Sequence, residues 1–116
     1  MSNKKFYALG RLKTGQMNKL ESAYESHLKT LLLSGEILWY KFEGIKLRLA
    51  DNTFYTPDFV LMLKSGQMEA HETKGFWTDD ARVKIKVAAE TFPLRFIAIK
   101  AKTKKDGGGW DREVFG

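Results

Sequence analysis

The most restrictive feature of the sequence is an aspartate inside its most apolar stretch. From Tyr55 to Leu63 the chain reads Tyr-Thr-Pro-Asp-Phe-Val-Leu-Met-Leu, with apolar side chains on both alternating faces. Such a strand is typical of a sheet that is covered on both sides. A carboxylate buried there without a partner is costly, so the position of Asp58 needs an explanation.

The next turn sets the register between this strand and the following one. Lys64-Ser65-Gly66 suits a three-residue hairpin loop, with glycine in the left-handed conformation, and Gln67 to Lys74 reads as the returning strand. Leu63 then faces Gln67, Val60 faces Ala70 and Asp58 faces Glu72. Thr56 and Lys74 form the next pair, because strand side chains alternate with period two. A slip of one residue would move Asp58 to the other face.

The predicted patch holds two acids, a lysine and a hydroxyl, which suits a hard divalent cation such as Mg²⁺. Such a cation supports phosphoryl chemistry, and Lys74 would stabilise developing charge or orient water. Each residue also has an ordinary interpretation: a turn residue for Asp58, an exposed face for Glu72 and a solvated strand end for Lys74. Their combination in one register, on a basic domain, favours the functional interpretation.

The remaining pattern predicts an α/β fold with a central mixed β-sheet flanked by helices, in the order α-β-β-β-β-α-β. Gln16 to Ser34 has an apolar stripe at helical spacing and is followed by Gly35. Ile37 to Phe42 and Ile45 to Leu49 read as a hairpin. A helix is expected from Thr78 to about Thr91, and a strand from Leu94 to Lys100. We expect one domain over residues 1–116, with a basic N-terminal arm (1–15) and a loose glycine-rich tail (102–116).

Charge and composition narrow the class of partner. The 116 residues carry a net charge of +6, which favours a polyanion such as nucleic acid. No apolar run is long enough to span a membrane, no signal peptide is visible and there is no cysteine, so a cytoplasmic location is expected. The candidate phosphate contacts, which a solvated basic face would equally explain, are Arg82, Lys84, Lys86, Lys100 and Lys102.

Two histidines and two tryptophans are further candidates for functional roles. His71 adjoins Glu72, but strand alternation points it to the opposite face, which favours a structural role. His27 lies on the helix stripe and favours core or interface. Trp77 is expected to pack under the helix, with stacking on an unpaired base as the rarer alternative. Trp110, in the glycine-rich tail, has no account from the sequence.

The chain resembles the PD-(D/E)XK nuclease superfamily in two strings. These are Tyr55-Thr56-Pro57-Asp58-Phe59 and Glu72-Thr73-Lys74-Gly75-Phe76-Trp77. More narrowly, the chain is similar to the phage endonuclease I family of Holliday-junction resolvases. The resemblance implies a restriction-endonuclease-like fold and a Mg²⁺ or Mn²⁺ ion held by Asp58, Glu72 and the Thr73 carbonyl, with Lys74 beside the attacking water. A Leu-Glu on the first helix matches Leu20-Glu21, which makes Glu21 a further catalytic acid, with Glu25 as the rival.

The resemblance therefore implies an endonuclease that hydrolyses DNA phosphodiesters, with branched DNA as the expected substrate. A phage origin, action in the bacterial cytoplasm and a homodimer that cuts two strands fit the same interpretation. Two alternatives stay open. One is a catalytically silent nucleic-acid-binding or assembly module of the same fold. The other is a nuclease for transposon ends or for a specific sequence.

Overall fold

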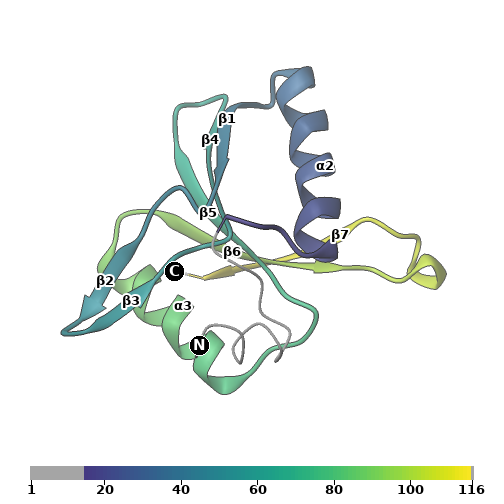
Figure 1. Cartoon of the computed structure of the whole chain (residues 1–116). Coiled ribbons are helices and arrows are strands. Elements are labelled where there is room, and N and C mark those ends of the chain that lie inside the picture. Colours follow the sequence, from purple (N-terminus) through teal and green to yellow (C-terminus); the bar gives the residue numbers. More distant parts are fainter. Residues whose placement is uncertain (1–14, 116) are drawn as a thin grey trace.

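Two sheets and two long helices form a mixed α/β fold in the computed structural model, which describes residues 15–115 (Figure 1). The main sheet has five strands in the order β1-β4-β5-β6-β7; β5 and β6 are parallel and the other neighbours antiparallel. The elements are α2 (Lys19–Ser34), β1 (Ile37–Phe42), β2 (Leu47–Ala50), β3 (Thr53–Tyr55), β4 (Phe59–Leu63), β5 (Met68–Thr73), α3 (Asp79–Thr91), β6 (Arg95–Ala101), the 3₁₀ turn η1 (Lys104–Asp106) and β7 (Trp110–Phe115).

The two faces of the main sheet bury separate apolar cores. One core joins α2 to the sheet around Leu28, Phe59 and Ile97, and the other joins α3 to it around Ile85 and Phe96. Phe59, Val60 and Leu61 of β4 are 0–1% exposed. The prediction that Tyr55 to Leu63 is covered on both sides is confirmed for these three residues, whereas Thr56 is exposed and Met62 and Leu63 are only partly buried.

Capping residues define both helices as the sequence predicts, within a few residues. Asn18 and Glu21 form a capping box, so α2 begins at Lys19 rather than Gln16 and ends before Gly35, whose φ is 81°. The Thr78 side chain accepts from the Ala81 amide at 3.2 Å, and α3 runs from Asp79 to Thr91.

The apolar stretch from Tyr55 to Leu63 is not one strand, which is a correction. Tyr55 ends β3, Phe59 begins β4, and Thr56-Pro57-Asp58 lies between them. Pro57 has no N–H to donate to a ladder, so the chain leaves one sheet and enters the other at this point.

The predicted hairpin of Ile37–Phe42 with Ile45–Leu49 is also wrong. β1 pairs with β4, where Tyr40 and Phe42 pack around Phe59. β2 pairs instead with β3 in a separate two-stranded sheet, turned at Asp51-Asn52.

The C-terminal segment is ordered, contrary to the expected loose tail. β7 pairs with β6 in antiparallel register. Phe115 lies opposite Phe96 at one end of the ladder, and Trp110 lies opposite Ala101 at the other. Gly107, Gly108 and Gly109 have positive φ values and close the turn, so the glycines specify a loop rather than flexibility. Trp110 packs on Tyr24 with ring centroids 5.0 Å apart, which supplies the missing account of this residue.

Trp110→Ala is therefore expected to destabilise the protein by about 2 kcal/mol, since a partly buried indole would lose its contacts with α2. The free energy of unfolding in urea measures this effect. Trp39→Ala, which removes a 43% exposed indole on β1, is the control and should cost much less. Equal costs for the two variants would contradict the packing role.

The expected N-terminal arm lies outside the described residues, apart from Gly15. Among the helices described, none is both long and apolar enough to cross a membrane.

Candidate metal and nucleic-acid site

The predicted register between β4 and β5 is confirmed. Val60 pairs with Ala70, and the Leu63 amide donates to the Gln67 carbonyl at 2.8 Å. Gly66, with φ 91°, closes the loop. Just beyond the ladder, the Asp58 amide donates to Glu72 Oε1 at 3.0 Å, so the two acids lie together.

Asp58 is held in place through both its side chain and its backbone. Its Oδ2 accepts from the Thr73 amide at 2.8 Å and from Thr73 Oγ1 at 2.7 Å. Its carbonyl accepts from the Glu43 amide at 2.7 Å. The next residue, Gly44, passes so close to Val60 that a Cβ there would lie 2.7 Å from Val60 Cγ1. Glycine therefore allows the loop after β1 to reach Asp58.

Glu72 is 8% exposed and lies between a hydroxyl and an ammonium group. The Tyr55 hydroxyl donates to its Oε1 at 3.0 Å, and Lys74 Nζ lies 3.1 Å from its Oε2. Burial and the charge of Asp58 raise the pKa of Glu72 to about 7, although Lys74 opposes the shift. Burial and the neighbouring Glu72 likewise raise the pKa of Tyr55, so it stays a donor.

The structure places Glu21, not Glu25, beside Asp58. Burial and then the adjacent Asp58 carboxyl raise the pKa of Glu21 to about 7, although its bond from the Asn18 amide opposes the shift. Glu25 instead accepts from the Tyr40 hydroxyl at 3.0 Å and lies 3.8 Å from Lys29 Nζ.

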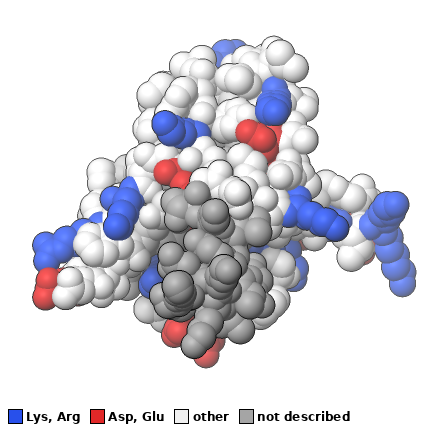
Figure 2. Space-filling model, in the orientation of Figure 1, with Lys and Arg blue, Asp and Glu red and all other residues white. Residues whose placement is uncertain are grey.

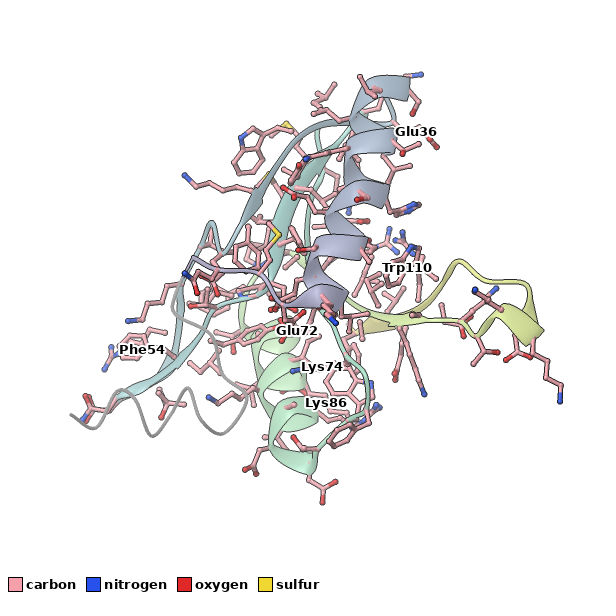
Figure 3. All side chains as sticks on the ribbon, turned by 45° about the vertical axis from the view of Figure 1, so that its right-hand side comes forward. Glu36, Phe54, Glu72, Lys74, Lys86 and Trp110 are labelled. Carbon is pink, nitrogen blue, oxygen red and sulfur yellow. The ribbon has the colours of Figure 1, made fainter. Side chains whose placement is uncertain are left out.

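The expected pairing of Thr56 with Lys74 is not formed, because the β4–β5 ladder begins at Phe59. Thr56 instead lines a cleft of about 840 Å³ together with Glu21 and Asp58. Figure 3 shows Glu72 and Lys74 near the first turn of α2, whereas Glu36 lies beyond its other end.

Over residues 15–115, no three His, Cys, Asp or Glu side chains form a group able to hold a metal ion. The oxygen donors beside each other are the carboxylates of Asp58 and Glu72, next to the Thr73 amide from which Asp58 accepts. One or two carboxylates and several waters are the usual ligands of Mg²⁺, so this set fits a hydrated divalent cation.

Asp58→Asn should raise the melting temperature in chelator at pH 8 by about 5 °C, because it removes like-charge repulsion while an amide oxygen still accepts from Thr73. A carboxyl whose folded pKa is raised stabilises the fold at low pH, and this stability is lost as pH rises from about 4.5 through about 7. Asparagine reduces that loss, so the difference between variant and wild type should grow from pH 5 to pH 8. A constant difference across thermal melts would contradict the coupling.

Sequence reasoning missed a buried polar network on the other face of β5. His71 is 2% exposed. Its Nε2 atom lies 2.9 Å from Glu69 Oε1, and its Nδ1 atom lies 2.6 Å from the Tyr24 hydroxyl oxygen. Burial alone would raise the pKa of Glu69, but His71 and the arginines at 95 and 112 outweigh it and lower that pKa. Burial lowers the pKa of His71, which favours the neutral ring. Because the Glu69 carboxylate only accepts, His71 Nε2 carries the proton and Nδ1 accepts from the Tyr24 hydroxyl. This confirms that His71 faces away from Glu72.

The five predicted phosphate contacts do not share one environment. Lys84 lines the cleft with Asp58, whereas Lys86 is exposed further along α3. Arg82 is paired with Glu113 at 2.9 Å, and Lys102 lies 3.7 Å from Asp111. These two pairings reduce the charge that Arg82 and Lys102 can offer to phosphates.

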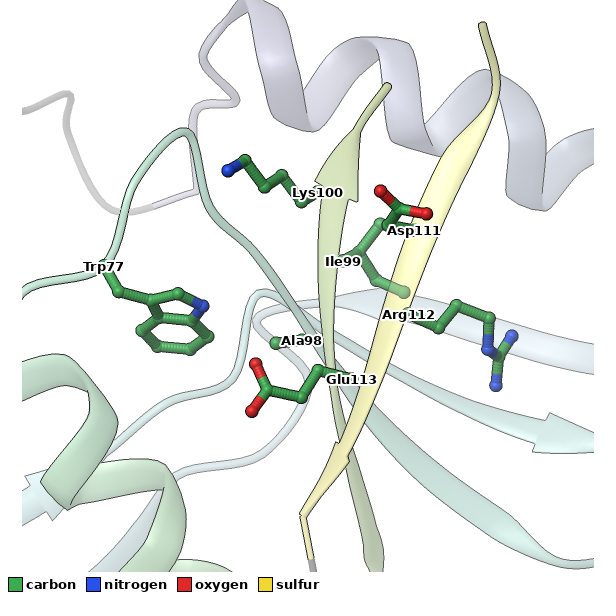
Figure 4. Close-up of a pocket in the computed structure, with 7 residues that line it drawn as sticks. All are labelled: Trp77, Ala98, Ile99, Lys100, Asp111, Arg112 and Glu113. Atoms are coloured by element: carbon green, nitrogen blue, oxygen red, sulfur yellow. The ribbon is translucent and has the colours of Figure 1, made fainter. Parts of the chain in front are cut away.

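Lys100 lines a small pocket of about 220 Å³ on the α3 face of β6 and β7, with Trp77 across from it (Figure 4). Trp77 packs edge-on against Phe115 with centroids 5.9 Å apart. Trp77 also packs against the core that contains Ile85 and Ala88 of α3, which supports the expectation that it packs under the helix.

Basic side chains are spread over the described surface in Figure 2, including both projecting hairpins, β2–β3 and β6–β7. The β6–β7 tip carries Lys104 and Lys105, both exposed. Comparison with models of protein families, with curated proteins and with solved structures finds no match to this chain.

Proposed function

We propose that the protein is a Mg²⁺- or Mn²⁺-dependent DNA endonuclease with a restriction-endonuclease-like fold. The observation that carries this proposal is the cluster in which Asp58 and Glu72 meet beside Lys74. Repulsion from Asp58 contributes to the raised pKa values of both Glu21 and Glu72, and a bound cation would relieve that repulsion.

Asp58, Glu72 and the Thr73 carbonyl would hold the cation. When bound, it would polarise a phosphoryl oxygen and make hydroxide accessible near neutral pH. Thr73 fixes the orientation of the Asp58 carboxylate, and Tyr55 fixes that of Glu72.

Lys74 is the residue best placed to act on the reacting phosphate. Its side chain is 27% exposed and its Nζ lies 3.1 Å from Glu72 Oε2, so the side chain is partly desolvated but reachable from solvent. It would orient water or stabilise charge on the phosphate in the transition state. Glu21, with a pKa near 7, would exchange a proton close to neutral pH.

The substrate that we propose is branched or junction DNA, as for a Holliday-junction resolvase of phage origin acting in the bacterial cytoplasm. The basic surface supports a nucleic-acid partner, and a chain this small fits a homodimer that cuts two strands.

One observation favours a second candidate, a catalytically silent binding module. Both oxygens of Glu72 already have partners, Tyr55 and the Asp58 amide on one and Lys74 on the other. A fully partnered carboxylate is also what a purely structural role requires.

Cleavage of a labelled four-way junction and of its matching linear duplex separates the two candidates. We expect cutting with Mg²⁺ or Mn²⁺ and none with chelator, with the junction cut faster. Comparable cutting of both DNAs would replace the resolvase with a general nuclease. Metal-independent binding by folded protein, with neither DNA cut, would overturn the nuclease proposal in favour of the binding module.

A further inference from the structure

The β2–β3 hairpin has two chemically different faces. Leu47, Leu49 and Tyr55 pack toward α3 in the second core. Arg48 pairs with Phe54, so these two side chains share the other face. Lys46 lies on that face too, because side chains alternate along a strand. One face thus anchors the hairpin, and the other carries two cations and an aromatic ring.

The basic-aromatic face opens onto the cleft of the proposed active site. Phe54 and Lys46 line that cleft together with Asp58 and Glu21. Phe54 is 41% exposed, and Lys46 Nζ lies 4.5 Å from its ring centroid. Arg48 lies 3.4 Å from Asp51, an exposed contact in which both side chains stay accessible.

An exposed ring with cations beside it matches the chemistry of an unpaired nucleotide. A base stacks on an aromatic face, and the phosphates that flank it pair with lysine or arginine. A base within a duplex is already stacked on its neighbours, so a single ring at a cleft favours DNA with unpaired bases.

We propose that Phe54, Lys46 and Arg48 form a binding surface for an unpaired nucleotide next to the scissile phosphate. This inference rests on the proposed function and names its substrate class: DNA with a single-stranded segment at a gap, flap or junction. Phe54 stacks on the base, and Lys46 and Arg48 contact the flanking phosphates.

The test measures binding rather than cleavage, in the Asp58→Asn background, by fluorescence anisotropy. The probes are a duplex with a short single-stranded gap and the same duplex without the gap. Phe54→Ala should weaken binding of the gapped DNA by about tenfold and of the intact duplex by less than about twofold. Lys46→Gln should weaken both and lower their salt dependence, since it removes a phosphate contact.

Trp39→Ala is the matched control, because it removes an exposed aromatic ring that does not line the cleft. An equal effect of Phe54→Ala on both DNAs, or an equal effect of Trp39→Ala, would overturn the inference.

Photo-crosslinking of full-length Asp58→Asn protein to gapped DNA with 5-iodouracil in the gap gives a second readout that does not need Phe54→Ala to fold. The expected crosslink is to the peptide that contains Phe54, and a crosslink confined to other peptides would overturn the inference.

If gapped-DNA selectivity depends on Phe54 while wild type cuts no DNA, the nucleotide surface stands and the nuclease proposal fails. If wild type cuts DNA but selectivity does not depend on Phe54, only this inference fails.

Discussion

Asp58→Asn is expected to slow the proposed metal-dependent DNA cleavage by roughly a thousandfold or more, the largest functional effect that the proposal predicts. Asparagine has nearly the same shape, and its oxygen still accepts from the Thr73 amide that holds Asp58. The substitution therefore removes the charge that a cation needs and leaves the β4–β5 junction intact. Initial rates on radiolabelled junction DNA at saturating Mg²⁺ measure the effect.

Glu36→Gln is the control for this prediction. Glu36 is exposed and lies beyond the end of α2 that is distant from Glu72 (Figure 3). Its side chain accepts from the Ser34 hydroxyl at 3.0 Å. The control should cut DNA at the wild-type rate. Wild-type cleavage by folded Asp58→Asn would exclude Asp58 from the reaction.

Tyr24→Ala should produce the largest loss of stability, about 4 kcal/mol. Tyr24 is 1% exposed and contacts Phe59 and Trp110, with ring centroids 5.7 and 5.0 Å away. Its removal leaves a cavity under α2 and an unpaired buried nitrogen on His71. Domains of this size are stable by about 5–15 kcal/mol, so urea unfolding should show a much earlier midpoint.

Tyr24→Phe separates the two contributions, since it keeps the ring and removes only the hydroxyl. We expect a cost of about 1–2 kcal/mol and unchanged DNA cleavage. Equal costs for Tyr24→Phe and Tyr24→Ala would mean that the hydrogen bond to His71, not packing, holds α2 on the sheet.

The site was more predictable from sequence than the fold around it. A glycine-closed loop fixes the pairing of β4 with β5, and alternation then places Asp58 beside Glu72. The choice of Glu21 over Glu25 needs the tertiary structure, because both lie on the same helix and only the packing of α2 decides which approaches Asp58.

Two of the errors in the fold have identifiable physical causes. Pro57 divides an apolar stretch that reads as one strand, because it interrupts the ladder without interrupting the apolar pattern. Gly107-Gly108-Gly109 indicates looseness by composition, yet Trp110 and Phe115 on either end of β7 bury their rings against α2 and α3. Tyr55 as the partner of Glu72 was also missed, although its place three residues before Asp58 could have suggested it.

Binding of Mn²⁺ tests the central claim most directly, because it requires neither a substrate nor catalysis. The loss of the free Mn²⁺ paramagnetic resonance signal on titration with protein reports the bound ion. The account predicts that wild type and Glu36→Gln bind Mn²⁺ saturably and that Asp58→Asn does not bind it. Equal binding by all three proteins, or none by folded wild type, would contradict the claim that Asp58 and Glu72 form a metal site.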